Sequence, residues 1–222
     1  MKITIITLYP DLIKPYLDGS ILGRAQKNKL IDINIINLRD FGLGNYKQVD
    51  DTPYGGGAGM ILRPDVVVPA IEKAKNNPLL PEEGPGVVGA KVIMLSPDGK
   101  PYDQKTAQRL SKTEHLILVC GRFEGFDERI KQCCDEVISV GPYVLSGGEL
   151  PALTIVESIV RLIPGVLGNP ASSVDESFTN DMVEYPQYTK PEIYKGKPVP
   201  DILKSGNHQD IAAWRRSHKR HI

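Results

Sequence analysis

The 222-residue sequence is poor in cysteine and has no excess of either charge. Three cysteines are present, and Cys133 and Cys134 are adjacent, so neither an even disulfide framework nor a CxxC pair is available. Basic and acidic residues number 27 each, which gives no whole-chain attraction to polyanions. The N-terminus lacks the layout of a signal peptide, and no apolar run approaches membrane-spanning length. These absences predict a soluble protein of the reducing cytoplasm.

Common nucleotide and metal motifs are missing as well. No GxxxxGK[ST] loop occurs, so a P-loop site is not supported. Gly84–Gly89 has the GxGxxG spacing, but it precedes an expected strand, whereas a dinucleotide site follows a strand and opens a helix. His218 and His221 have no neighbours that would complete a metal shell. A dinucleotide-dependent oxidoreductase is therefore disfavoured, and no metal ligands are predicted.

Short apolar runs alternate with segments of helical spacing. The runs predict strands at Lys2–Leu8, Ile31–Leu38, Lys91–Ser96, His115–Gly121 and Glu136–Gly141. The segments between and after them predict helices at Asp11–Leu30, Asp65–Asn76, Gln104–Glu114, Gly125–Cys133 and Leu150–Leu162. This alternation is typical of an α/β domain with a largely parallel sheet.

The composition changes after the last of these helices. Pro, Gly and Ser become frequent, as in a flexible linker, and we place the boundaries at 1–168 (main domain), 169–181 (linker) and 182–222 (small C-terminal domain). The last segment carries eight Lys/Arg and four Asp/Glu, which favours a phosphate-binding surface, although a solvated tail has the same composition. Its final helix is expected to begin at the N-cap Asn207, with Asp210 completing a capping box.

Three glycine-bearing loops each follow an expected strand. They are Leu95–Gly99 (LSPDG), Cys120–Gly125 (CGRFEG) and Ser139–Pro151 (SVGPYVLSGGELP). In open α/β sheets ligands bind at the carboxyl ends of strands, and glycine there lets the backbone approach the ligand. LSPDG alone is an ordinary turn in most proteins. The joint occurrence of the three loops predicts one ligand site.

Eight ordered strings carry a resemblance over almost the whole chain. They are YGGGAGMILRPD (54–65), LSPDG (95–99), CGRFEGFDER (120–129), YVLSGGELPAL (143–153), RLIPGVLGN (161–169), ESF (176–178), YPQYTKPE (185–192) and LKSGNHQDIAAWR (203–215). The chain resembles the bacterial tRNA (guanine-N1)-methyltransferases of the SPOUT superfamily. The resemblance implies methylation by S-adenosylmethionine of guanine N1 at tRNA position 37, just 3′ of the anticodon, which supports reading-frame maintenance.

The resemblance also implies features that periodicity cannot show. These are a deep C-terminal trefoil knot in the α/β domain, a small, mainly helical C-terminal domain that holds tRNA, a homodimer with active sites at the subunit interface, and a requirement for Mg²⁺, which Glu124 is a candidate to place. Knots are rare exceptions to the usual rules of chain connection. By position, the cofactor site comprises Leu95, Ser96, Pro97, Gly121, Glu124, Tyr143, Leu145, Gly147, Gly148 and Pro151.

The chemistry requires a base and a cation. Guanine N1 carries a proton at neutral pH, which a carboxylate can remove, while an arginine near O6 stabilises the developing negative charge. The resemblance places Arg161 at O6, although an arginine at a helix C-terminus also complements the helix dipole. The family usually has Asp before Ser-Phe, where this chain has Glu176 preceded by Asp175. The base is therefore Glu176 in another rotamer, or Asp175 after a shift of the linker.

The C-terminal segment supplies the expected tRNA contacts. Tyr185, Tyr188 or Trp214 would stack on anticodon-loop bases, although Trp214 lies on an amphipathic helix and is also expected in a core. Phosphate contacts are expected from Lys190, Lys195, Lys204, Arg215, Arg216, Lys219 and Arg220. Two alternatives stay open: a SPOUT methyltransferase acting on another RNA site, and a non-catalytic RNA-binding relative.

Overall fold

The computed structural model describes residues 1–76, 89–168, 177–178 and 182–221. The chain forms two compact units, 1–168 and 169–222. The first unit is built on one parallel sheet in the strand order β2-β1-β6-β5-β7. Its strands are β1 (Lys2–Thr7), β2 (Asp32–Asn37), β5 (Lys91–Pro101), β6 (His115–Cys120) and β7 (Glu136–Ser139). The expected α/β class and parallel sheet are confirmed.

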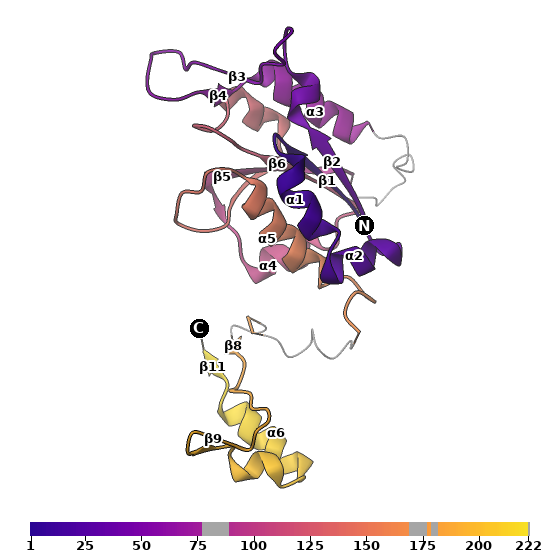
Figure 1. The fold of residues 1–222 in the computed structure, drawn as a ribbon, viewed down its shortest axis with the longest axis vertical. Coiled ribbons are helices and arrows are strands. Elements are labelled where there is room, and N and C mark those ends of the chain that lie inside the picture. Colours follow the sequence, from indigo (N-terminus) through magenta and orange to yellow (C-terminus); the bar gives the residue numbers. More distant parts are fainter. Residues whose placement is uncertain (77–88, 169–176, 179–181, 222) are drawn as a thin grey trace. The chain divides into compact units, whose positions relative to one another are not determined.

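Helices cover both faces of this sheet (Figure 1). One face packs against α1 (Pro10–Leu17), α2 (Ser20–Lys27), α4 (Gln104–Leu110) and α5 (Glu149–Val160). The other packs against α3 (Pro64–Lys75) and the 3₁₀ helices η1 (Leu38–Phe41) and η2 (Glu128–Cys133). Because side chains alternate along a strand, Ile5 enters the first layer of the core and Ile6 the second. The central strands β1 and β6 are accordingly buried along their whole length.

Two of the expected helices differ from the structure. The helix expected over 11–30 is two helices, because α1 ends at Leu17 and Ser20 has a positive φ of 47°. The helix expected over 125–133 is the shorter 3₁₀ helix η2, preceded by Phe123 and Gly125 at φ 59° and 110°. A right-handed helix cannot pass through such residues. The hairpin of β3 (Asp50–Asp51) and β4 (Ile61–Leu62) was not expected at all.

The second unit is small and has no buried side chain among the residues that the structure describes there. It contains α6 (His208–Ser217) and the 3₁₀ helix η5 (Asp201–Lys204). Two short antiparallel pairs accompany them: β8 (Met182–Val183) with β11 (Arg220–His221), and β9 (Ile193–Tyr194) with β10 (Lys197–Pro198). In the described parts of both units, no helix is long and apolar enough to cross a membrane.

The N-cap of α6 is confirmed. The Asn207 side-chain oxygen accepts hydrogen bonds from the backbone N–H groups of Gln209 and Asp210. In a capping box the Asp210 carboxylate would accept a hydrogen bond from the backbone N–H of Asn207. Here it accepts instead from the side-chain amide of Asn207, at 2.7 Å.

Candidate functional site

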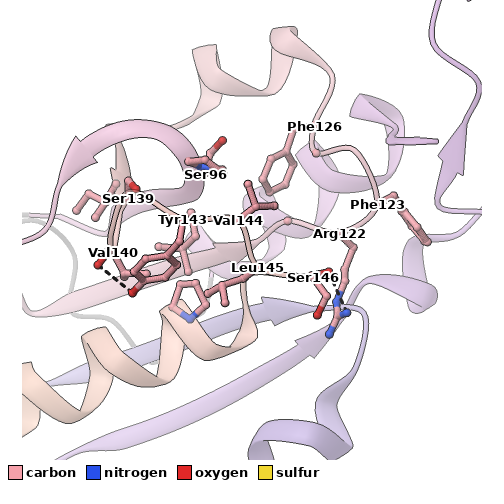
Figure 2. A pocket seen from close by; sticks show the side chains of 18 of the residues that line it. Ser96, Arg122, Phe123, Phe126, Ser139, Val140, Tyr143, Val144, Leu145 and Ser146 are labelled. Carbon is pink, nitrogen blue, oxygen red and sulfur yellow. Dashed lines mark hydrogen bonds between the residues drawn. The ribbon is translucent and has the colours of Figure 1, made fainter. Parts of the chain in front are cut away.

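A cavity of about 200 Å³ lies at the carboxyl ends of three neighbouring strands, β6, β5 and β7 (Figure 2). Each strand delivers one of the three glycine-bearing loops to its wall. This is the edge at which ligands bind in open α/β sheets. The structure thus brings together three segments that are separated along the chain.

All ten residues that the resemblance assigned to a cofactor line this cavity. Val140 and Tyr143 lie toward one end of the cavity, and Arg122 and Ser146 lie toward the other (Figure 2). The ten did not include several wall residues of the same loops and their flanks, although the loops themselves could have pointed to them. These are Arg122, Phe123, Gly125, Phe126, Ile138, Ser139, Val140, Gly141, Val144 and Ser146.

The first loop projects from the sheet as an irregularity within β5. Leu95 and Lys100 both pair with Ile138 of β7, so the four residues between them leave the ladder. Gly99 closes this excursion against the neighbouring strand, because an added Cβ there would lie 2.6 Å from the Ile138 backbone. A side chain at Gly99 would push the loop off the sheet.

The second and third loops touch backbone to backbone. The Gly148 N–H donates a 2.8 Å hydrogen bond to the Gly121 carbonyl. A Cβ on Gly148 would lie 2.7 Å from Cys120 Cα, and one on Gly121 would lie 2.9 Å from the Phe126 ring. Glycine at these positions keeps the two walls in contact and leaves main-chain N–H and C=O groups near the ligand.

The wall combines apolar side chains with few charges. Leu95, Leu145 and Phe126 are among the apolar groups, and Arg122 and Glu124 are the only ionisable Lys, Arg, Asp or Glu side chains among the described residues that line it. Burial raises the pKa of the Cys120 thiol beneath the wall, which keeps it an inert thiol. Apolar faces with backbone polar groups suit an adenine ring edge, so these residues fit an adenosyl group.

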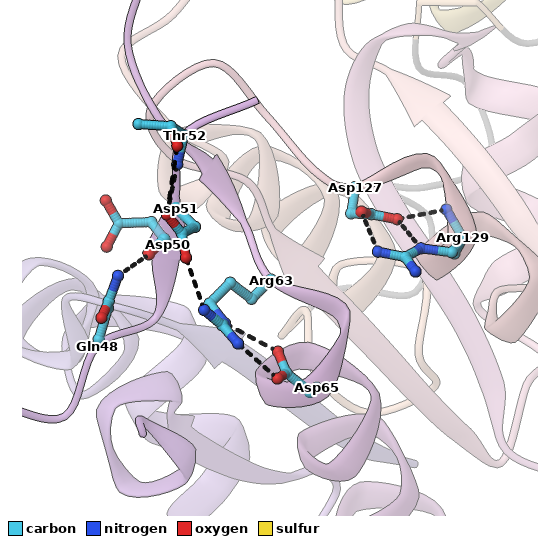
Figure 3. A network of polar contacts seen from close by, with 8 residues as sticks. All are labelled: Gln48, Asp50, Asp51, Thr52, Arg63, Asp65, Asp127 and Arg129. Atoms are coloured by element: carbon cyan, nitrogen blue, oxygen red, sulfur yellow. Dashed lines mark hydrogen bonds and ion pairs between the residues drawn. The ribbon is translucent and has the colours of Figure 1, made fainter. Parts of the chain in front are cut away.

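A second hollow of about 410 Å³ lies beside the YGGGAG loop. Arg63 bridges Asp51 at 2.7 Å and Asp65 at 2.8 Å, and Arg129 pairs with Asp127 (Figure 3). The hydrogen bonds from Arg63 lower the pKa of the Asp65 carboxyl. This network fixes the base of the hairpin.

The hairpin of β3 and β4 lines the second hollow and also contacts the wall of the cavity. The Glu124 N–H donates to the Met60 carbonyl at 2.9 Å, and the Glu124 side chain lies where a Cβ on Gly59 would be. The YGGGAG loop therefore packs directly on the CGRFEG loop. Both strings stand out in the sequence, but this contact does not, because it depends on bonds between residues far apart in the chain.

Comparison with known proteins decides the family. A family model described as tRNA (Guanine-1)-methyltransferase TrmD matches residues 1–221. The chain belongs to this family. A tRNA (guanine-N(1)-)-methyltransferase of Geobacillus kaustophilus is 50% identical over 216 residues, which are 97% of this chain and 85% of the relative. Proteins of the same name from Thermus thermophilus and Staphylococcus epidermidis are each 47% identical, over 97% and 99% of this chain and 85% and 86% of theirs.

Of the catalytic residues that the resemblance implies, Arg161 is not among the described residues that line the cavity. Arg161 follows the last turn of α5, whose first residue, Glu149, comes directly after Gly148 of the cavity wall. At about 1.5 Å per residue, the helix separates the two by roughly 18 Å. Asp175 and Glu176 lie outside the residues that the structure describes.

The C-terminal unit of the family member displays some of the expected tRNA-binding side chains. The Arg215 guanidinium lies 5.1 Å from the Tyr185 ring centroid, while Lys204 is paired with Glu192 and Asp201. Trp214 is half-buried, stacked on His218 at 4.0 Å and tilted against Tyr188 at 6.4 Å. Trp214 therefore has a packing role within this unit.

Proposed function

We propose that this chain transfers a methyl group from S-adenosylmethionine to N1 of guanine at position 37 of a cytoplasmic tRNA, and so supports reading-frame maintenance. The observation that carries the proposal is the convergence of three loops on one cavity in a chain that belongs to the tRNA (guanine-1)-methyltransferase family. The unit 1–168 would be the methyltransferase domain, with its C-terminal loops threaded as a trefoil knot.

The cofactor would be held by the ten lining residues named above. Leu95, Leu145 and Pro97 offer apolar contacts, and the glycines leave backbone groups open to the adenine edge. Bound S-adenosylmethionine supplies a methyl group already activated on a sulfonium. The remaining task of the chain is to hold donor and acceptor in line and to manage one proton.

The proton on guanine N1 would pass to Glu176 or, after a shift of the linker, to Asp175. Arg161 would stabilise charge at O6. Because α5 separates Arg161 from the cavity of its own subunit, we propose a homodimer in which Arg161 of the partner subunit completes each site. The length of α5 supports this arrangement.

The proposed Mg²⁺ would keep most of its waters, with Glu124, a carboxylate on the cavity wall, as the candidate to help place it. Among the described residues, no group of three or more His, Cys, Asp or Glu could hold a metal ion. Mg²⁺ often keeps several waters and uses one or two carboxylates, so this is compatible with a loosely held ion.

The second unit would hold the tRNA. Its exposed lysines and arginines would contact phosphates, and Tyr185 or Tyr188 would stack on unpaired bases. The pair of Arg215 and Tyr185 presents a cation and a ring together, which suits a nucleotide. The linker over 169–181 would bring the carboxylates to the target base.

The proposal is tested by methyl transfer from labelled cofactor to two unmodified leucine-type tRNA transcripts, with Mg²⁺ present. One carries guanosine and the other adenosine 3′ of the anticodon. Label in the first alone, recovered as 1-methylguanosine, is the expected result. Equal label in both would favour another RNA site, and no label in either would favour a non-catalytic RNA-binding relative.

A further inference from the structure

Arg122 lies on the cavity wall with its charge largely enclosed. Among the described residues on that wall, no other side chain is a lysine or arginine. Its side chain is 17% exposed, and its guanidinium carbon lies 4.6 Å from the centroid of the Tyr9 ring. Its Nη1 donates to the Ser146 carbonyl at 3.1 Å (Figure 2). The guanidinium is therefore fixed in place beside the space that a ligand would fill.

A buried carboxylate faces this guanidinium. The Glu149 side chain is 4% exposed, and its Oε2 lies 3.0 Å from Arg122 Nε. Its Oε1 accepts a 2.7 Å hydrogen bond from the Thr7 hydroxyl at the end of β1. Gly147 leaves the space for the pair, because a Cβ there would meet Arg122 Nε and lie 2.6 Å from Glu149 Oε2.

The pair acts through charge rather than through a directed bond. Neither Arg122 Nε nor Glu149 Oε2 has a hydrogen-bond partner among the described residues, although the two atoms are 3.0 Å apart. Burying two charges is costly, and such pairs are weak contributors to stability. Glu149 also stands in the first turn of α5, where an acid is favoured by the helix dipole, so a purely structural role is the alternative to exclude.

We propose that Glu149 is a positioning residue that neutralises Arg122, so that the cavity accepts a cationic cofactor. S-adenosylmethionine carries a positive sulfonium, whereas the product S-adenosylhomocysteine carries a neutral thioether. An uncompensated guanidinium on the wall would repel the sulfonium of S-adenosylmethionine and would not repel the neutral thioether of S-adenosylhomocysteine. The Glu149–Arg122 pair thereby sets the affinity for cofactor relative to product, an inference that rests on the proposed function.

The test compares calorimetric dissociation constants for the two ligands in wild type and Glu149→Gln. Glutamine keeps the size of the side chain and removes its charge. The ratio of S-adenosylmethionine affinity to S-adenosylhomocysteine affinity should fall about tenfold, on the order expected for unit charges roughly 10 Å apart at an effective dielectric constant of about 20. An equal change for both ligands would overturn the proposal.

Two further variants give the sign of the effect. Arg122→Gln leaves the carboxylate alone and should shift the ratio toward S-adenosylmethionine, while the double variant should return it to within about twofold of wild type. If Glu149→Gln does not fold, Arg122→Gln decides, and an unchanged ratio in that variant overturns the proposal. Failure of wild type to bind either ligand would contradict the proposed function instead.

Discussion

Gly148→Ala tests whether the contact between the second and third loops builds the cavity. Gly148 has φ −82° and ψ −1°, so alanine meets no backbone strain there, and any effect is steric. The added Cβ would lie 2.7 Å from Cys120 Cα and 2.8 Å from the Gly121 nitrogen. These are backbone atoms at the end of a fully buried strand, and they cannot rotate away.

The magnitude follows from this overlap. To relieve this overlap, the second and third loops must separate by several tenths of an ångström. That movement stretches the 2.8 Å hydrogen bond from the Gly148 N–H to the Gly121 carbonyl. Overpacking of this kind costs about 1–3 kcal/mol. Because the displaced loops are facing walls of the cavity, we expect the affinity for S-adenosylhomocysteine to fall about tenfold or more, equivalent to at least about 1.4 kcal/mol.

The assay is calorimetry with S-adenosylhomocysteine, accompanied by urea unfolding. The matched control is Gly168→Ala, because a Cβ on Gly168 would have nothing within 4 Å, and this variant should bind as wild type does. Wild-type affinity in Gly148→Ala would refute the reasoning that this backbone contact shapes the ligand site.

Three other predictions concern pH, the base and the small unit. Burial, with a smaller contribution from Lys2, lowers the pKa of His115 to about 4. Because the unfolded chain binds this proton from about pH 6.5 downward, the free energy of unfolding should be undiminished above that pH and about 2 kcal/mol lower by pH 5. Urea midpoints that fall by the same amount in His115→Gln would contradict this. Glu176→Ala and Asp175→Ala, made separately, should differ in the rate of single-turnover methyl transfer. The rate should fall about 100-fold or more in the variant that lacks the base, while cofactor affinity stays unchanged in both. Full activity of Glu176→Ala would show that Glu176 is not the base. Asn207→Ala should destabilise α6 by about 1 kcal/mol, seen as faster amide exchange at Gln209 and Asp210, whereas Ser217→Ala at the other end should leave those amides unchanged.

The sheet and the glycine-bearing loops were predictable because their signals are local. Leu118 and Val119 of β6 enter opposite layers of the core, so both faces of this strand had to be apolar, and the run LILVC (116–120) shows this directly in the sequence. The three loops are continuous strings that follow such strands. Their assembly into one wall needed only the rule that parallel strands end at one edge.

The features that were missed depend on distant residues. The hairpin before α3 is fixed where Leu62 N–H bonds the Gly125 carbonyl and Asp127 N–H bonds the Leu62 carbonyl, and no local pattern specifies such partners. Glu149 meets Thr7 across 142 positions of the chain, so its burial could not be inferred from GGELP. The break at Ser20 was missed because a positive φ at serine has no strong sequence signature. The roles of Arg161, Asp175 and Glu176 came from family resemblance alone and stay predictions.

The most direct test of the central claim is a crystal structure of the full chain with S-adenosylhomocysteine. We expect ligand density in the cavity at the ends of β5, β6 and β7, in contact with all three loops. Density in the hollow beside Arg63 and Asp51, or on the C-terminal unit, with the three-loop cavity empty, would contradict it.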